Sequence, residues 1–106
     1  MKLKSVIIDG TKFIIDESKE PIFIESSRCL GIIDHTQGVI SIDDSLGETI
    51  KPTVLMHEIV HGILCSRGFD ELSSNEEAVE AIARGIINLI NDNSELIKYI
   101  NEQAKK

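Results

Sequence analysis

The chain has 106 residues, of which 42% are hydrophobic and only 4% aromatic, and its formal net charge is -7. This length suits a single domain, residues 1–106, with a core of aliphatic side chains. The acidic charge and the scattered lysines and arginines exclude a nucleic-acid-binding surface, which needs clustered basic residues. Because no apolar run is long enough for a signal peptide or a membrane span, we expect a cytoplasmic protein with no membrane partner.

The first half of the chain alternates short apolar runs with turn residues, which predicts strands. Ser5–Ile8 and residues 12–15 flank the dipeptide Asp9-Gly10, whose residues readily adopt the positive φ angles of a tight hairpin. Ile22–Ile24, directly after Pro21, is a further candidate strand. This segment predicts one β-hairpin followed by a short strand.

A second hairpin is predicted from two apolar runs, residues 30–33 and 39–42, on either side of the loop 34–38. Alternation in the second run places Ile40 and Ile42 on one face. This strand comes directly before the first predicted helix, and we expect residues 39–43 to be able to pair with an extended peptide.

The second half of the chain is predicted to be helical. Thr49 or a neighbour can cap a helix that carries Pro52 in its first turn, runs to about Ser66 and stops at Gly68. Within it, Gly62 would permit a close approach of another helix or a strand.

A second helix is predicted after Ser73 and Ser74, because each serine stands three residues before a glutamate, as in a capping box. It carries an apolar stripe of 3.6-residue period: Val79, Ile82, Ala83, Ile86, Leu89 and Ile90. A last short helix is expected over residues 95–103. The predicted fold class is α+β, a small antiparallel sheet of two hairpins followed by two or three helices.

The most informative motif is His57-Glu58-Ile59-Val60-His61, a His-Glu-x-x-His pattern. Residues four apart on a helix lie one above the other, so His57 and His61 can share one zinc ion, with Zn–N distances of roughly 2.0–2.1 Å. Glu58 lies about 100° around the helix, beside the metal and not on it, where it can act as general base towards a water. The simpler interpretation is a pair of core or surface histidines with a glutamate on the helix surface.

A zinc site needs a third protein ligand, and the second predicted helix offers Glu76, Glu77 and Glu80. Glu76 lies nearest the apolar face, Glu80 somewhat further, and Glu77 on the opposite side. Either Glu76 or Glu80 could ligate while the other supports a zinc-bound histidine. Glu76 also fits as the capping-box partner of Ser73, so the choice stays open.

Other candidate residues give weaker signals. Cys29 and Cys65 form no Cys-x-x-Cys pair and are predicted to be buried free thiols. His35 lies in the loop of the second hairpin, where an exposed histidine needs no functional explanation; a role as a transition-state donor is the alternative.

Two segments of the chain resemble the ImmA/IrrE-type zinc metallopeptidases, in particular their very short versions from bacterial phages and mobile elements. One segment is residues 55–61, which contain the histidine motif, and the other is residues 75–83, which look like the family's glutamate-bearing helix. The resemblance implies a minimal zincin-like metallopeptidase core, with His57 and His61 as ligands, Glu58 as base and a glutamate of the second helix as third ligand. It also implies a protein substrate, such as a cytoplasmic repressor or regulator.

The function expected from the sequence is therefore zinc-dependent hydrolysis of a peptide bond, with Glu58 as general base. One alternative is a metal-stabilised module that binds a partner protein without turnover. Another is a helical interaction protein without a metal. An accessible cleft beside Glu58 with an open coordination position would favour the enzyme; a fourth protein ligand or a plugged cleft would favour the binding module.

Overall fold

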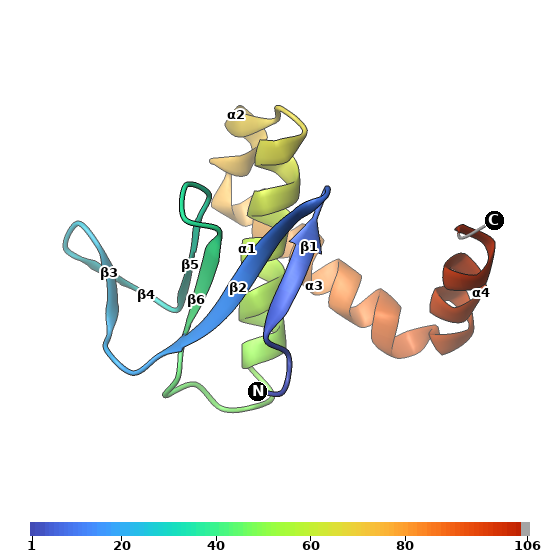
Figure 1. Ribbon diagram of the computed structural model, residues 1–106, viewed down its shortest axis with the longest axis horizontal. Coiled ribbons are helices and arrows are strands. Elements are labelled where there is room, and N and C mark those ends of the chain that lie inside the picture. The colour runs from blue at the N-terminus through green and yellow to red at the C-terminus, as the bar shows by residue number, and fades with distance from the viewer. Residues whose placement is uncertain (105–106) are drawn as a thin grey trace.

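The computed structural model describes residues 1–104 and confirms an α+β fold. A sheet, the helix α1 and the helix α3 form three successive layers, while α4 lies apart from the sheet (Figure 1). In chain order the elements are β1 (Ser5–Ile8), β2 (Thr11–Ser18), β3 (Ile22–Ile24), β4 (Ser27–Cys29), β5 (Gly31–Asp34), β6 (Val39–Asp43), α1 (Lys51–Ser66), α2 (Asp70–Ser73), α3 (Glu76–Asp92) and α4 (Ser94–Ala104).

Both predicted hairpins are present, but the sheet they form is mixed and not purely antiparallel. Its strand order is β1-β2-β6-β5, and β2 and β6 run parallel in its centre. The expectation of a purely antiparallel sheet was wrong. After β2 the chain forms the separate β3–β4 hairpin, and β6 then lies between β2 and β5 and runs parallel to β2. The turn residues Asp9 and Gly10 have φ angles of 46° and 83°, which confirms the positive φ angles predicted from the sequence for this hairpin.

The strand β3 is confirmed, and it pairs with a strand that was not predicted. β3 and β4 form a separate two-stranded sheet, joined by Glu25 and Ser26. Glu25 adopts a φ of 57°, a conformation for which the sequence offers neither glycine nor asparagine. The hairpin signal was therefore missing from the sequence.

The helix α1 is the middle layer, and apolar side chains cover it on two sides. Towards the sheet lies the larger core cluster: Ile8, Phe13, Ile15, Ile40, Ile42, Val54 and Leu55. Towards α3 lies a smaller cluster of Val60, Val79 and Ala83. A Cβ atom at Gly62 would lie 2.8 Å from Ile8 Cδ1 and 3.0 Å from Ile33 Cδ1. Gly62 therefore permits the close helix–strand approach that was predicted.

The helix boundaries agree with the sequence better than the predicted caps do. Pro52 lies in the first turn of α1, and Gly68, with a φ of 82°, follows its end. Thr49 is not the cap, because the residue that precedes the helix is Ile50, which makes no side-chain capping bond. The capping box of Ser73 and Ser74 is also wrong: Asn75 caps α3 by accepting a hydrogen bond from the Ala78 N–H.

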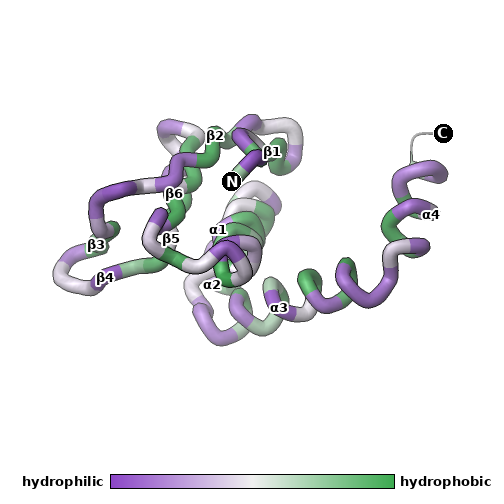
Figure 2. The backbone as a smooth tube through the Cα atoms, turned by 90° about the horizontal axis from the view of Figure 1, so that it is seen from below, coloured by the Kyte–Doolittle hydropathy of each residue, from purple (hydrophilic) through white to green (hydrophobic). Residues whose placement is uncertain are grey.

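The far half of α3 and the whole of α4 project from the body as a bent arm (Figure 2). Only Val79 and Ala83 of the predicted α3 stripe are fully buried, whereas Ile82, Leu89 and Ile90 are exposed. Hydrophobic segments recur along both parts of the arm in Figure 2. Among residues 1–104, no helix combines the length and the apolar character needed to cross a bilayer.

Candidate metal centre

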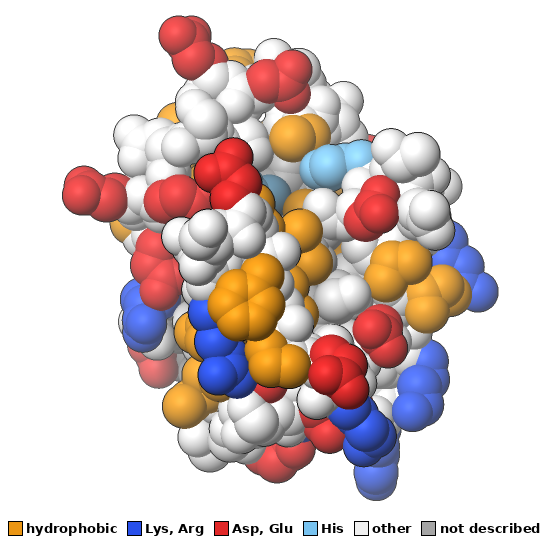
Figure 3. All heavy atoms as spheres, turned by 90° about the vertical axis from the view of Figure 1, so that its left-hand side faces the viewer, with side chains coloured by type: hydrophobic (Ala, Val, Ile, Leu, Met, Phe, Trp, Pro, Cys, Tyr) orange, Lys and Arg blue, Asp and Glu red, His pale blue; other side chains and the backbone are white. Residues whose placement is uncertain are grey.

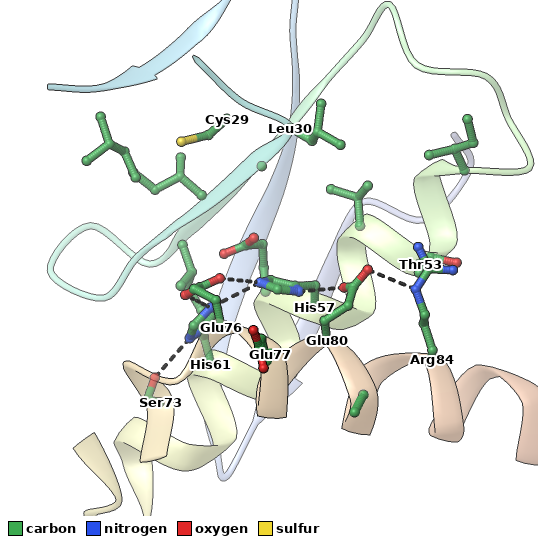
Figure 4. A pocket seen from close by; sticks show the side chains of 18 of the residues that line it. Cys29, Leu30, Thr53, His57, His61, Ser73, Glu76, Glu77, Glu80 and Arg84 are labelled. Carbon is green, nitrogen blue, oxygen red and sulfur yellow. Dashed lines mark hydrogen bonds and ion pairs between the residues drawn. The ribbon is translucent and has the colours of Figure 1, made fainter. Parts of the chain in front are cut away.

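Two histidines of α1 and one glutamate of α3 converge at the wall of a cleft (Figure 4). His57 and His61 are one turn apart, and their Nε2 atoms are 3.2 Å from each other. The Glu76 carboxylate places Oε2 2.9 Å from His57 Nε2 and Oε1 3.0 Å from His61 Nε2. The three side chains are therefore close enough to hold a metal ion.

The spacing of these atoms fits a small tetrahedral cation. With metal–ligand distances of about 2.0–2.1 Å, neighbouring ligand atoms of a tetrahedral zinc site lie about 3.3 Å apart. The 3.2 Å between the two Nε2 atoms is close to that value, and each Nε2 atom has a different oxygen of the Glu76 carboxylate next to it, at 2.9 Å and 3.0 Å. Two imidazole nitrogens and one carboxylate also form a donor set that zinc accepts.

Each imidazole is oriented through its second nitrogen. The Nδ1–H of His57 donates to Glu80 Oε1 at 2.8 Å, and Glu80 Oε2 accepts from Arg84 Nε at 2.9 Å. His61 Nδ1 lies 2.9 Å from Ser73 Oγ, a buried hydroxyl that also accepts from the Cys65 thiol. A proton held on Nδ1 leaves the Nε2 lone pair free for a metal.

The choice between Glu76 and Glu80 follows from this geometry. Glu76 contacts both Nε2 atoms, on the ligand side, whereas Glu80 contacts only the far nitrogen of His57. Hydrogen bonds from His57 and Arg84 lower the pKa of Glu80 despite a desolvation effect in the opposite direction, so its carboxylate is an ionised acceptor. Glu76 is thus the carboxylate close enough to hold a metal together with both histidines, and Glu80 is placed to support the His57 imidazole.

The carboxylate cluster also affects the protonation of His57. Burial lowers the pKa of its imidazole, but the hydrogen bonds with Glu80 and Glu76 raise it more, and the net shift is upward. Protons and a cation therefore compete for the same Nε2 atom.

Glu58 lies next to this cluster but belongs to none of its hydrogen bonds. Its side chain is only 7% exposed, and no ion pair or hydrogen bond joins it to another side chain within residues 1–104. Burial raises the pKa of Glu58 to about 7, the nearby His57 lowers it, and Glu76 raises it further. A carboxyl group with this pKa can gain or lose a proton near neutral pH.

The cluster opens into a cleft of about 1220 Å³. One wall comes from β3–β5 and the opposite wall from α1, α2 and α3. The apolar lining residues include Ile24, Leu30, Ile33, Ile50 and Val54, and the acidic ones are Glu58, Glu76, Glu77 and Glu80. In Figure 3, a histidine side chain is visible beside a hollow that is bordered by hydrophobic and acidic side chains.

The remaining candidates have mixed outcomes. Glu77 was expected on the opposite side of its helix, yet it lines the cleft without joining the ligand cluster. His35 lines the cleft and packs edge-on against Phe13, with ring centroids 6.1 Å apart. Cys29 and Cys65 are free thiols, as predicted, but they are half-buried and not fully buried as expected. Ser73 was missed as a partner of His61 because its spacing to Glu76 matched a capping box.

Comparisons of the chain with protein-family models, curated proteins and solved structures found no match.

Proposed function

We propose that this chain is a zinc-dependent metallopeptidase that hydrolyses peptide bonds, with Glu58 as general base. The observation that carries the proposal is the position of a buried carboxyl group of neutral pKa beside two imidazoles and a carboxylate, in a cleft that a peptide can enter. A zincin-like core and membership of the ImmA/IrrE-type family, for which residues 55–61 and 75–83 are the motifs, are part of the same proposal.

His57, His61 and Glu76 would hold the ion, and Glu80 and Ser73 would fix the two imidazoles through Nδ1. When bound, zinc supplies Lewis-acid polarisation of the scissile carbonyl and lowers the pKa of water in its open position. No fourth side chain of residues 1–104 joins the cluster, which leaves one position free for water or substrate.

Glu58 would take a proton from the attacking water and pass it to the leaving amine. Two properties suit it to both transfers: its carboxylate is not neutralised by an ion pair, and its pKa of about 7 lies near physiological pH. The surrounding burial keeps bulk water from competing with substrate for this proton.

An extended substrate would bind along β5, not along β6 as the sequence suggested. β6 is paired on both sides, with β2 and β5, so its backbone groups are occupied. β5 is the edge strand, and the carbonyl of Leu30, the residue just before it, accepts from the Asp43 N–H. In an antiparallel pair the backbone groups of successive residues point alternately towards the partner strand and away from it. The N–H and C=O groups of Ile32 therefore also point towards β6, whereas those of Gly31 and Ile33 point away from it, towards the cleft.

The proposal is tested with purified full-length protein loaded with zinc and incubated with a mixed peptide library, with cleavage read by mass spectrometry. We expect zinc-dependent cleavage, and we expect Glu58→Gln to retain one zinc per chain but lose cleavage. His61→Ala should lose both. Glu77→Gln is the matched control, because Glu77 lines the same cleft outside the ligand cluster and should leave cleavage unchanged. If Glu58→Gln cleaves as fast as the wild type, the general-base role is wrong.

A binding module without turnover is the second candidate. It would retain zinc yet cleave no peptide, with or without Glu58. The open cleft and the free ligand position favour the enzyme over this alternative.

A further inference from the structure

Arg84 stands out among the side chains that line the cleft, because it brings a positive charge to an acidic wall. Among residues 1–104 it is the only lysine or arginine that lines the cleft, whereas Glu58, Glu76, Glu77 and Glu80 all do. The two lining histidines of the cluster point their Nε2 atoms at the metal position. Arg84 is therefore the lining side chain best suited to bind a negatively charged group of a substrate.

The Arg84 guanidinium is held at one nitrogen and leaves the other two available. Its Nε–H donates to Glu80 Oε2 at 2.9 Å, an i,i+4 pair within α3. Within residues 1–104 no hydrogen bond or ion pair involves its Nη atoms, and the side chain is 66% exposed. In Figure 4 this side chain rises from α3 beyond Glu80, at the end of the cleft where Thr53 also lies. The two Nη groups can donate side by side to both oxygens of one carboxylate.

Arg84 lies within reach of a peptide that is bound at the metal position. The path from His57 Nε2 crosses the imidazole, the 2.8 Å bond to Glu80, the Glu80 carboxylate and the 2.9 Å bond to Arg84 Nε. A carboxylate on the far side of the guanidinium is then at most about 15 Å from that Nε2 atom. An extended peptide advances about 3.3 Å per residue, so the carboxylate belongs to a residue within about four of the scissile bond.

The two helices that bear the site place Arg84 at the end of the cleft where α1 begins. Glu76 contacts His61, and Glu80, one turn later in α3, contacts the earlier histidine, His57. The helices therefore run in opposite directions. Arg84 follows Glu80 by one further turn and so lies beside the first turns of α1.

The edge strand β5 fixes which end of a substrate meets Arg84. A Cβ atom at Gly31, the first residue of β5, would lie 3.0 Å from Val54 in the first turn of α1. A Cβ atom at Gly62, near the end of α1, would lie 3.0 Å from Ile33. β5 therefore begins at the Arg84 end of the cleft. Antiparallel pairing is the more stable arrangement of strands, and a peptide bound antiparallel to β5 directs its carboxyl end to Arg84.

We propose that Arg84 binds a carboxylate on the carboxyl-terminal side of the scissile bond, supplied by an Asp or Glu side chain or by the free C-terminus of the substrate. The inference rests on the proposed peptidase function for its reference to a scissile bond, whereas the carboxylate site itself requires only that a peptide lies along β5. Arg84 is then a specificity-determining residue, and a peptide with lysine or arginine at this position is repelled.

The test measures binding of fluorescent peptide pools to the zinc-loaded Glu58→Gln chain, in which bound peptides should stay intact. Each pool is a random mixture of uncharged amino acids, about six residues long, with an uncharged fluorophore on the amino terminus. One pool ends in a free carboxylate, and the reference pool ends in an amide. Two amidated pools carry one glutamate, either second from the carboxyl end or second from the amino end. A last amidated pool carries lysine second from the carboxyl end.

We expect the free-carboxylate pool, the pool with glutamate near the carboxyl end, or both to bind at least about fivefold more tightly than the reference. Which of them gains affinity identifies the source of the carboxylate. Arg84→Gln should remove this preference, and Arg84→Glu should transfer it to the lysine pool. Lys98→Gln is the matched control, because it removes a positive charge from α4, outside the cleft, and should retain the preference.

Several results would overturn the proposal. Equal binding of all pools, or binding of none, would do so, and so would a preference that survives Arg84→Gln or that favours glutamate near the amino end. The readout is the ratio between pools on one protein, so a variant that holds less zinc weakens every pool and does not imitate the expected result. Arg84→Lys keeps the charge without the planar fork and should keep a smaller preference.

The outcome for the carboxylate site is separable from the outcome for the enzyme. A preference that depends on Arg84, in a chain whose wild type cleaves no peptide, would support the carboxylate site and refute the peptidase. Zinc-dependent cleavage without any preference would support the peptidase and refute the carboxylate site.

Discussion

Replacing Glu80 with alanine removes the support that this carboxylate gives to the His57 imidazole. Glu80 accepts the Nδ1–H of His57 at 2.8 Å while Arg84 holds its other oxygen at 2.9 Å. The carboxylate thereby fixes both the ring orientation and the position of the ring proton. Without it, the imidazole can rotate or carry its proton on Nε2, and both changes oppose metal binding.

The expected loss of zinc affinity follows from the kind of hydrogen bond that is removed and from how exposed Glu80 is. Loss of a carboxylate that supports a metal-bound histidine typically weakens metal affinity about 10–100-fold, or ~1.4–2.8 kcal/mol. The Glu80 side chain is 39% exposed, so water can replace part of the lost interaction. We therefore expect the lower half of the range, a loss of about 10–30-fold in zinc affinity, or ~1.4–2 kcal/mol.

The assay is a zinc titration in competition with a chromophoric chelator at fixed pH. Glu77→Ala is the matched control, because Glu77 lies on the same helix and lines the same cleft but does not join the ligand cluster. Glu76→Ala should weaken zinc far more than Glu80→Ala, since it removes a ligand. Zinc affinity of Glu80→Ala within about twofold of the wild type, or an equal loss in Glu77→Ala, would refute the supporting role.

Three further predictions concern stability. With a chelator present at pH 8, Glu58→Gln should be about 2–3 kcal/mol more stable to urea than the wild type. Burial raises the pKa of Glu58 from 4.5 to about 7, so the wild type loses stability as the pH rises from 4.5 to 7, and that loss is complete at pH 8. This difference should vanish near pH 4, and a constant difference would contradict the assignment. Gly62→Ala should be about 1–3 kcal/mol less stable than Gly85→Ala in urea, because only the Gly62 position lacks room for a Cβ; equal stabilities would contradict this. The hydrogen bond from Lys51 holds the pKa of Glu17 at about 2, so the wild type should lose stability as the pH falls from 4.5 towards 2, and acid titration of Glu17→Gln should show a flatter profile.

Features that depend on local sequence could be predicted. The hairpin at Asp9-Gly10 and the end of α1 before Gly68 are set by residues that favour positive φ angles. The one-turn spacing of His57 and His61 also places both imidazoles at one site without reference to the rest of the fold.

Features that depend on pairing between distant segments of the chain could not be predicted from the sequence. Nothing in β2 or β6 alone indicates that the two strands lie side by side and parallel, because both are simply apolar on the buried face. Ser73 fits two local roles, and only the packing of α2 against α1 brings its hydroxyl to His61. The choice between Glu76 and Glu80 likewise depends on how α3 is rotated about its axis against α1.

The same helix, α3, begins with Glu76, a residue placed to hold a metal, and ends in the exposed arm. Its 17 residues correspond to a rod of about 26 Å. The small cluster around Val79 and Ala83, near the metal end, is its only buried anchor. About 11 residues, or about 16 Å of helix, separate that anchor from the distant end, so a tilt of about 10° around the anchor would move that end by about 3 Å. Any movement that metal binding imposed on Glu76 would therefore also change where the other end of α3 points.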